Sequence, residues 1–177
     1  EHSTKVPLII SGPGIPKGQT SEALVYLFDV FPTLMDYLSF EEPENIDGKS
    51  LMNLIHKKEN QVRPNLFTAY RNTIRAIRDE EWKLIFYPQI KVTQLYNLKE
   101  DPNELNNLAL NYFYKRRVEK MMNLLKHNME LTDDTINLNP SKIISKEYNY
   151  KNLVQKLDPW QPKYIIEKYF PEGTSRN

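Results

Sequence analysis

The sequence predicts an α/β fold in which the end of a larger mixed α/β sheet domain is followed by a small antiparallel sheet packed with a long C-terminal helix. Three observations predict this fold. Residues 6–10 form a continuous apolar run, which is typical of a strand buried on both faces. Residues 65–98 contain four short strand-like runs. Residues 105–129 carry the spacing of an amphipathic helix.

The apolar run over residues 6–10 leads into a loop rich in glycine and proline over residues 11–18. A strand needs neighbours for its backbone donors and acceptors, and the sequence offers none before this run. The chain also opens on Glu1 rather than on methionine. We therefore expect the rest of the sheet to lie upstream, in a longer protein of which this sequence is the back part.

A helix is predicted from Asp29 to Leu38, because the Asp29 carboxylate can cap the free N–H groups of a first turn. Apolar residues at spacings of three and four share one face of this helix, and we expect that face to pack on the core: Phe31, Leu34, Met35 and Leu38. A turn at Asp47-Gly48 and a short amphipathic helix over residues 51–55 follow.

The four strand-like runs are residues 65–70, 73–78, 82–87 and 94–98, separated by short polar connections. Residues 78–81 suit a hairpin loop between the second and the third run, and such connections favour an antiparallel sheet. The amphipathic helix over residues 105–129 would then cover this sheet.

Three segments follow from this pattern. Residues 1–60 form the end of the α/β domain, residues 61–131 form a subdomain of four antiparallel strands plus a helix, and residues 132–177 form a tail rich in Lys, Asn and Tyr.

Composition excludes several classes of function. The 24 Lys and Arg residues nearly balance the 23 Asp and Glu residues, and a formal net charge of +1 is no basis for a nucleic-acid partner. The chain has 0 cysteines, so it has no disulfide and no thiolate nucleophile or ligand. Its apolar runs are far shorter than the ~20 residues of a membrane span, so no membrane anchor is expected in this chain.

Few residues are candidates for chemistry. The three histidines do not lie at metal-ligand spacing, and Asp133-Asp134 is either a calcium ligand pair or, as we favour, a solvated pair at a helix end. Arg71, Arg75 and Arg78 can grip an anion, because a guanidinium matches the oxygens of sulfate or carboxylate. Their alternative is a salt-bridged strand surface with the acidic residues 79–81 as partners, which we favour from the residues alone.

The order of five motifs resembles the carboxy-terminal portion of the sulfatase family, in the alkaline-phosphatase superfamily. The first motif is the opening Glu-His through Val-Pro-Leu-Ile to Gly-Pro-Gly, with Lys5 where the family more often has arginine. The second and third are Asp-Val-Phe-Pro-Thr-Leu and Asp-Gly-Lys-Ser-Leu. The last two are Arg-Ala-Ile-Arg followed by Trp-Lys-Leu-Ile, and the run from Leu-Tyr-Asn-Leu to Glu-Leu-Asn-Asn-Leu, with Asn97 in place of aspartate. They occupy residues 1–14, 29–36, 47–51, 75–85 and 95–108.

The resemblance implies a hydrolase that removes sulfate from an ester, with a sulfated small molecule or glycan as the substrate. It also implies that the full-length enzyme uses a formylglycine nucleophile and a calcium ion. The motifs that carry the nucleophile and the metal ligands have no counterpart in this sequence, so no catalytic and no metal-binding residue is assigned, and the 177 residues alone are expected to be inactive. The implied partner is the missing N-terminal portion of the same protein. His2, Arg71 and Arg75 are the candidates for substrate contacts. The resemblance implies a periplasmic, extracellular or lysosomal location.

Two other functions stay open. The chain could be the carboxy-terminal part of a related phosphodiesterase or phosphonate monoester hydrolase, which the upstream nucleophile motif would distinguish. It could instead be a stand-alone carbohydrate-binding module that uses exposed aromatic residues such as Tyr87 or Trp160 as sugar platforms.

Overall fold

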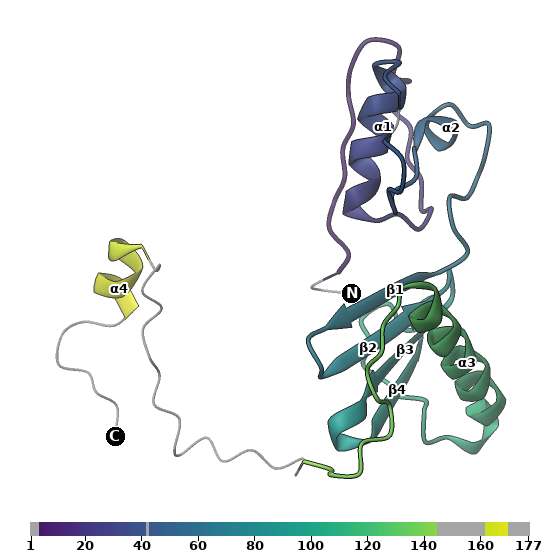
Figure 1. The fold of residues 1–177 in the computed structure, drawn as a ribbon, viewed down its shortest axis with the longest axis vertical. Coiled ribbons are helices and arrows are strands. Elements are labelled where there is room, and N and C mark those ends of the chain that lie inside the picture. The colour runs from purple at the N-terminus through teal and green to yellow at the C-terminus, as the bar shows by residue number, and fades with distance from the viewer. Residues whose placement is uncertain (1–3, 42, 145–161, 170–177) are drawn as a thin grey trace. The chain divides into compact units, whose positions relative to one another are not determined.

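Four antiparallel strands form the central sheet, in the order β1-β2-β3-β4 (Figure 1). They are β1 (Leu66–Tyr70), β2 (Ile74–Arg78), β3 (Trp82–Tyr87) and β4 (Val92–Asn97). The computed structural model describes residues 4–41, 43–144 and 162–169. The predicted antiparallel sheet is confirmed, and β4 begins two residues earlier than predicted.

The register of the sheet decides which residues meet the helix. Ile77 lies opposite Leu84, and Leu84 lies opposite Leu95. Because directly opposite residues of neighbouring strands point to the same face, these three side chains lie on the same face of the sheet. All three are fully buried.

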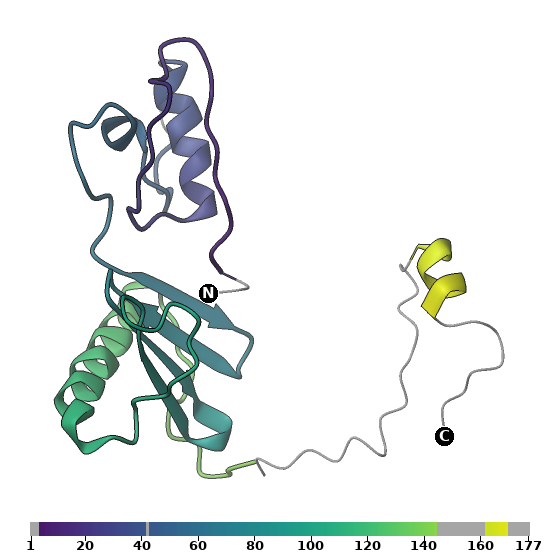
Figure 2. The same ribbon diagram turned by 180° about the vertical axis from the view of Figure 1, so that it is seen from behind.

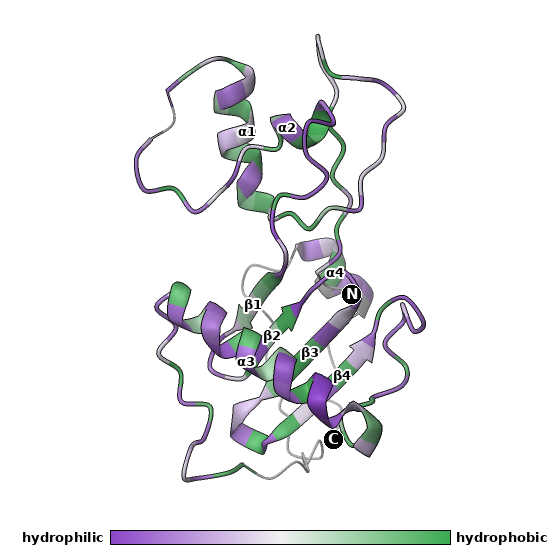
Figure 3. Cartoon of the chain, turned by 90° about the vertical axis from the view of Figure 1, so that its right-hand side faces the viewer, coloured by the Kyte–Doolittle hydropathy of each residue, from purple (hydrophilic) through white to green (hydrophobic). Residues whose placement is uncertain are grey.

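The helix α3 (Lys115–Leu131) covers that face of the sheet, as Figure 2 shows from behind. Its buried residues Met121, Leu125 and Met129 follow at intervals of four and join the buried face of the sheet in one core. In Figure 3, hydrophilic and hydrophobic residues alternate along α3, as expected for a helix with one buried side.

The predicted start of this helix at Leu105 is wrong by ten residues. Asn107 lies instead along β4, where its side-chain oxygen accepts a hydrogen bond from the Leu95 N–H at 2.9 Å. The Leu108 N–H donates to the Leu95 carbonyl at 2.8 Å. Asparagine side chains compete in this way with helical hydrogen bonds, so residues 105–111 form no helix, and Asn107 and Leu108 bond to the edge of the sheet instead.

Residues before the sheet form η1 (Leu27–Asp29), α1 (Val30–Tyr37) and α2 (Met52–Ile55). Both predicted helices are therefore present. Gly48, in the predicted turn, lies so close to the Phe28 carbonyl that a Cβ atom would be 2.7 Å from that oxygen.

Two expectations for this segment are wrong within the described structure. Residues 6–10 form no strand, and Val6 and Ile9 are exposed, because none of the four strands reaches this segment. The apolar face of α1 is also exposed at Phe31, Leu34 and Leu38. The residues that α1 buries are Pro32 and Thr33, whose hydroxyl accepts a hydrogen bond from the Leu51 N–H.

The chain divides into two units, Glu1–Ile144 and Ser145–Asn177, and each is described by itself. The second contains α4 (Lys163–Tyr169), in which Lys163 and Glu167 form an ion pair of 3.6 Å. No helix among the described residues is both long and apolar enough to span a membrane.

Candidate functional site

The turn between β1 and β2 carries the candidate site. Arg71 follows the last residue of β1 and has a φ angle of 47°. This is the left-handed region, which residues other than glycine seldom adopt. The Thr73 N–H closes the turn by donating to the Tyr70 carbonyl at 3.2 Å. Tyr70 and Arg71 are exposed, and the Arg71 guanidinium lies 5.6 Å from the centre of the Tyr70 ring.

Arg75 lies behind this turn, on the face of the sheet that α3 covers, and is 5% exposed. Its Nε and one terminal nitrogen donate to the two oxygens of Asp134, the second bond at 3.0 Å. Its other terminal nitrogen donates to the Arg71 carbonyl at 2.6 Å and to the Ile74 carbonyl at 2.8 Å. One guanidinium therefore joins the end of α3 to the backbone of the turn.

Asp134 belongs to the loop that follows α3. Its N–H donates to the Met129 carbonyl at 2.9 Å, and one carboxylate oxygen accepts a bond from the Ile136 N–H at 3.1 Å. The hydrogen bonds from Arg75, more than offsetting partial burial, hold the pKa of the Asp134 carboxyl below its ordinary value. The carboxylate is thus ionised at neutral pH, and each of its oxygens accepts a bond from Arg75.

The sequence candidates have different outcomes. Arg71 lies at the exposed turn, Arg75 is buried behind it, and His2 lies outside the described residues. Their role in substrate binding stays a prediction. The partner expected for Arg75 was wrong, because it pairs with Asp134 rather than with the acidic loop.

Tyr70 is a further candidate, which the sequence reasoning missed. The signal that could have found it is its position next to Arg71 at the end of a predicted strand, where a turn exposes both side chains.

Of the two aromatic residues considered as sugar platforms, Tyr87 is half-buried and its hydroxyl is 3.4 Å from the Gln94 side-chain oxygen. Trp160 lies outside the described residues.

A buried ion pair connects the N-terminal segment to the sheet. Asp29 is fully buried, and both its oxygens accept hydrogen bonds from Arg63, at 2.5 and 2.6 Å. They also accept bonds from the N–H groups of Tyr26 and Lys49. The prediction that this carboxylate caps α1 is therefore wrong. The Tyr26 hydroxyl donates to the Phe67 carbonyl of β1 at 2.9 Å, which completes the connection.

The free energy of unfolding is expected to fall on acidification. Burial alone would raise the pKa of Asp29, but the hydrogen bonds from Arg63 and the backbone hold it below its ordinary value. A lowered folded pKa stabilises the fold above the unfolded pKa of about 3.9, and that stability is lost as the pH falls through the folded value. Urea unfolding of the chain between about pH 6 and pH 3 should therefore show a steeper loss for the wild type than for Asp29→Asn.

The matched control for this series is Asp36→Asn, at an exposed carboxylate that accepts a bond from the Ser50 hydroxyl. It should lose stability with pH as the wild type does. An equally steep loss in Asp29→Asn would contradict the assignment.

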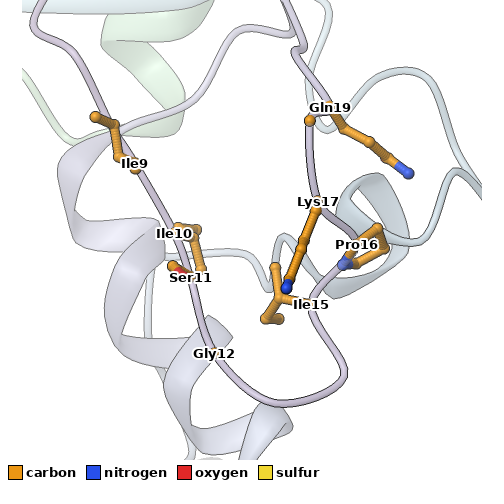
Figure 4. Close-up of a pocket in the computed structure, with 9 residues that line it drawn as sticks. Ile9, Ile10, Ser11, Gly12, Ile15, Pro16, Lys17 and Gln19 are labelled. Carbon is orange, nitrogen blue, oxygen red and sulfur yellow. The ribbon is translucent and has the colours of Figure 1, made fainter.

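Other candidate sites are weaker. A hollow of about 280 Å³ lies inside the loop over residues 9–19, and Lys17 is the one charged residue among those that line it (Figure 4). A third buried ion pair joins Lys83 of β3 to Glu104 at 2.6 Å. Within the described ranges, no three histidine or acidic side chains gather as metal ligands do.

Comparison with known proteins gives the following similarities. The family model of the C-terminal region of N-sulphoglucosamine sulphohydrolase matches residues 1–133. Arylsulfatase K of Gallus gallus is 30% identical over 186 residues, which cover 94% of this chain and 35% of that protein. An N-acetylglucosamine-6-O-sulfatase of Bacteroides thetaiotaomicron is 29% identical over 147 residues, which cover 76% of this chain and 26% of that protein. The chain thus spans about a third or less of the length of these relatives.

Among solved structures, the phosphonate monoester hydrolase of Silicibacter pomeroyi has a TM-score of 0.61 at 16% identity, covering 71% of this chain and 29% of that one. At this level of identity the similarity is one of fold.

Proposed function

Because this chain belongs to the sulfatase family, we propose that it is the carboxy-terminal part of a sulfuric ester hydrolase that acts on a sulfated carbohydrate. The observation that carries the proposal is the match of the sulphohydrolase C-terminal model to residues 1–133, which include the whole four-stranded sheet and α3. The sulfated sugars named in that family description and in the name of the Bacteroides relative support the class of substrate.

In this proposal, residues 1–60 complete a larger α/β catalytic domain, and residues 61–131 form the family's C-terminal subdomain. The exposed apolar side chains of residues 6–10 and of α1 support the first assignment, because they give the segment an apolar surface with no described partner. Residues 132–177 are then a tail of one subgroup, although its first part includes Asp134.

The subdomain would contribute to substrate recognition rather than to bond cleavage. The β1–β2 turn offers Arg71, a permanently charged donor whose planar guanidinium fits two oxygens of a sulfate group. Tyr70 beside it offers an exposed aromatic ring for a sugar face. Contact of His2 with the substrate is part of the same proposal.

The residues described here do not fit a calcium ion. Calcium takes six to eight oxygen ligands, and no group of three acidic or histidine side chains is gathered in the described ranges. Asp29, Glu104 and Asp134 each pair with a buried cation instead. The calcium and formylglycine chemistry of the family is therefore not assigned to these residues.

The proposal is tested by inorganic sulfate release from an aryl sulfate with calcium present. The 177-residue chain should release none, whereas the complete protein, with the residues that precede Glu1, should turn the substrate over. Turnover by the chain alone would overturn the division of roles. No turnover by the complete protein with aryl sulfate or a sulfated glucosamine would overturn the sulfatase function itself.

A second candidate is a phosphonate monoester hydrolase. The observation that favours it is the fold similarity to the Silicibacter enzyme. Comparing rates on a sulfate ester and on a phosphonate monoester distinguishes the two reactions.

A further inference from the structure

We propose that Asp134 and Arg75 are positioning residues that hold the β1–β2 turn in the conformation in which Arg71 binds a sulfated sugar. This inference rests on the proposed function. It adds a determinant of specificity to that function: Asp134, in the loop after α3, pairs with Arg75, which lies 59 positions earlier in β2 and holds the turn that carries Arg71.

The first step is the geometry of the Arg75 guanidinium. Two of its nitrogens are held by both oxygens of Asp134, which fixes the plane of the guanidinium. The third nitrogen then points at the backbone of the turn and donates to the carbonyls of Arg71 and Ile74. A lysine at this position could not make these contacts together, because its ammonium has no planar fork.

The second step is the conformation of the turn. Arg71 has a Cβ atom and still adopts a φ of 47°. Left-handed backbone at a residue other than glycine costs about 1 kcal/mol or more and persists where the surroundings hold it. The 2.6 Å hydrogen bond from buried Arg75 to the Arg71 carbonyl holds it here, together with the bonds from Thr73 to the Tyr70 carbonyl. Without the bond from Arg75, the left-handed conformation of Arg71 in the turn is less strongly favoured.

The third step is the pair of side chains that this turn exposes to a ligand, Arg71 and Tyr70. The Arg71 side chain is exposed and forms no ion pair with a carboxylate in the described part of the chain. Its guanidinium lies over the exposed Tyr70 ring, at 5.6 Å from the ring centre. A cation next to an aromatic platform suits a ligand that has both a sulfate group and an apolar sugar face.

Both residues of the Arg75–Asp134 pair are held by the packed sheet and helix. Arg75 lies opposite Phe86 in the register, and Phe86 belongs to the buried core under α3. Asp134 is tied to the last turn of the helix through the Met129 carbonyl. Asp134→Asn keeps one oxygen that can accept a hydrogen bond from Arg75 and leaves the apolar core residues in place, but the buried Arg75 cation then lacks its charged partner, so the free energy of unfolding also falls.

The test uses the complete enzyme and compares KM for a sulfated glucosamine disaccharide with KM for a small aryl sulfate, which reports the chemistry without the sugar contacts. Arg71→Ala should raise the disaccharide KM about tenfold, the effect of losing one charge-assisted contact. Asp134→Asn should raise it about threefold or more with kcat retained, as expected for partial loss of a binding geometry. Arg75→Lys should act as Asp134→Asn does.

The matched control is Asp133→Asn, because Asp133 neighbours Asp134, is exposed and has a φ of 51° that asparagine tolerates. It should leave the disaccharide KM unchanged. The double variant Arg71→Ala/Asp134→Asn should be no worse than Arg71→Ala, because Asp134 acts through Arg71.

Additive effects in the double variant, or equal losses on the aryl sulfate and the disaccharide, would overturn the proposal and indicate a merely structural pair. A complete wild-type enzyme with no activity on either substrate would instead contradict the proposed function. The ratio of the two KM values thus separates failure of the inference from failure of the function.

Discussion

Replacing Asp29 with alanine is expected to lower the free energy of unfolding of the chain by about 3–5 kcal/mol, because it leaves the Arg63 cation buried without its partner. Arg63 is only 7% exposed, and its guanidinium is also stacked 4.6 Å from the centre of the Tyr26 ring. Urea unfolding at neutral pH, followed by circular dichroism, measures the change.

The control for Asp29→Ala is Asp36→Ala, which removes a carboxylate from the exposed side of α1 and should cost less than about 1 kcal/mol. The double variant Asp29→Ala/Arg63→Met should recover part of the loss, since no uncompensated charge is then buried. A loss of about 1 kcal/mol or less in Asp29→Ala would contradict the account of this ion pair.

Replacing Leu125 with alanine is expected to cost about 2–5 kcal/mol, the usual result of removing a large side chain from a tightly packed core. Leu125 has 0% exposure and lies in the core that α3 forms with the sheet. The same unfolding measurement gives the value.

Leu131→Ala is the matched control for Leu125→Ala, because Leu131 ends the same helix and is 69% exposed. Its effect should stay within about 0.5 kcal/mol. If the two leucine variants were destabilised equally, the buried face assigned to α3 would be wrong.

The sheet was predictable from the sequence because its strands are short strand-like runs that are separated by polar connections and follow one another in a simple meander. The predicted limits of β3 agree with the structure at both ends. β4 begins earlier than predicted because Lys91 adopts a left-handed conformation, with φ at 49°, and lets the chain turn directly into the strand.

Elements that depend on distant contacts were not predictable. Residues 105–111 are apolar enough for a helix, but the Asn107 side chain finds its partners in β4, twelve residues earlier. The apolar spacing of α1 was recognised correctly as one face of a helix. Whether that face is covered depends on what packs against it, which spacing does not specify.

The candidate site was predicted in part. The arginines of β2 and its preceding turn stood out by residue type. The pairing of Arg75 with Asp134 could not be read from the sequence, because it arises only when α3 folds back across the sheet. Arg63 was not recognised as the partner of Asp29 either, because the two residues lie 34 positions apart and meet only in the folded chain.

The most direct test of the central claim, that this chain serves a sulfatase, is the ratio of kcat/KM for a sulfated glucosamine to kcat/KM for a phosphonate monoester, measured on the complete protein. The account predicts a ratio well above one, with inorganic sulfate as the product. A ratio well below one, or binding of the sugar without release of sulfate, would contradict it.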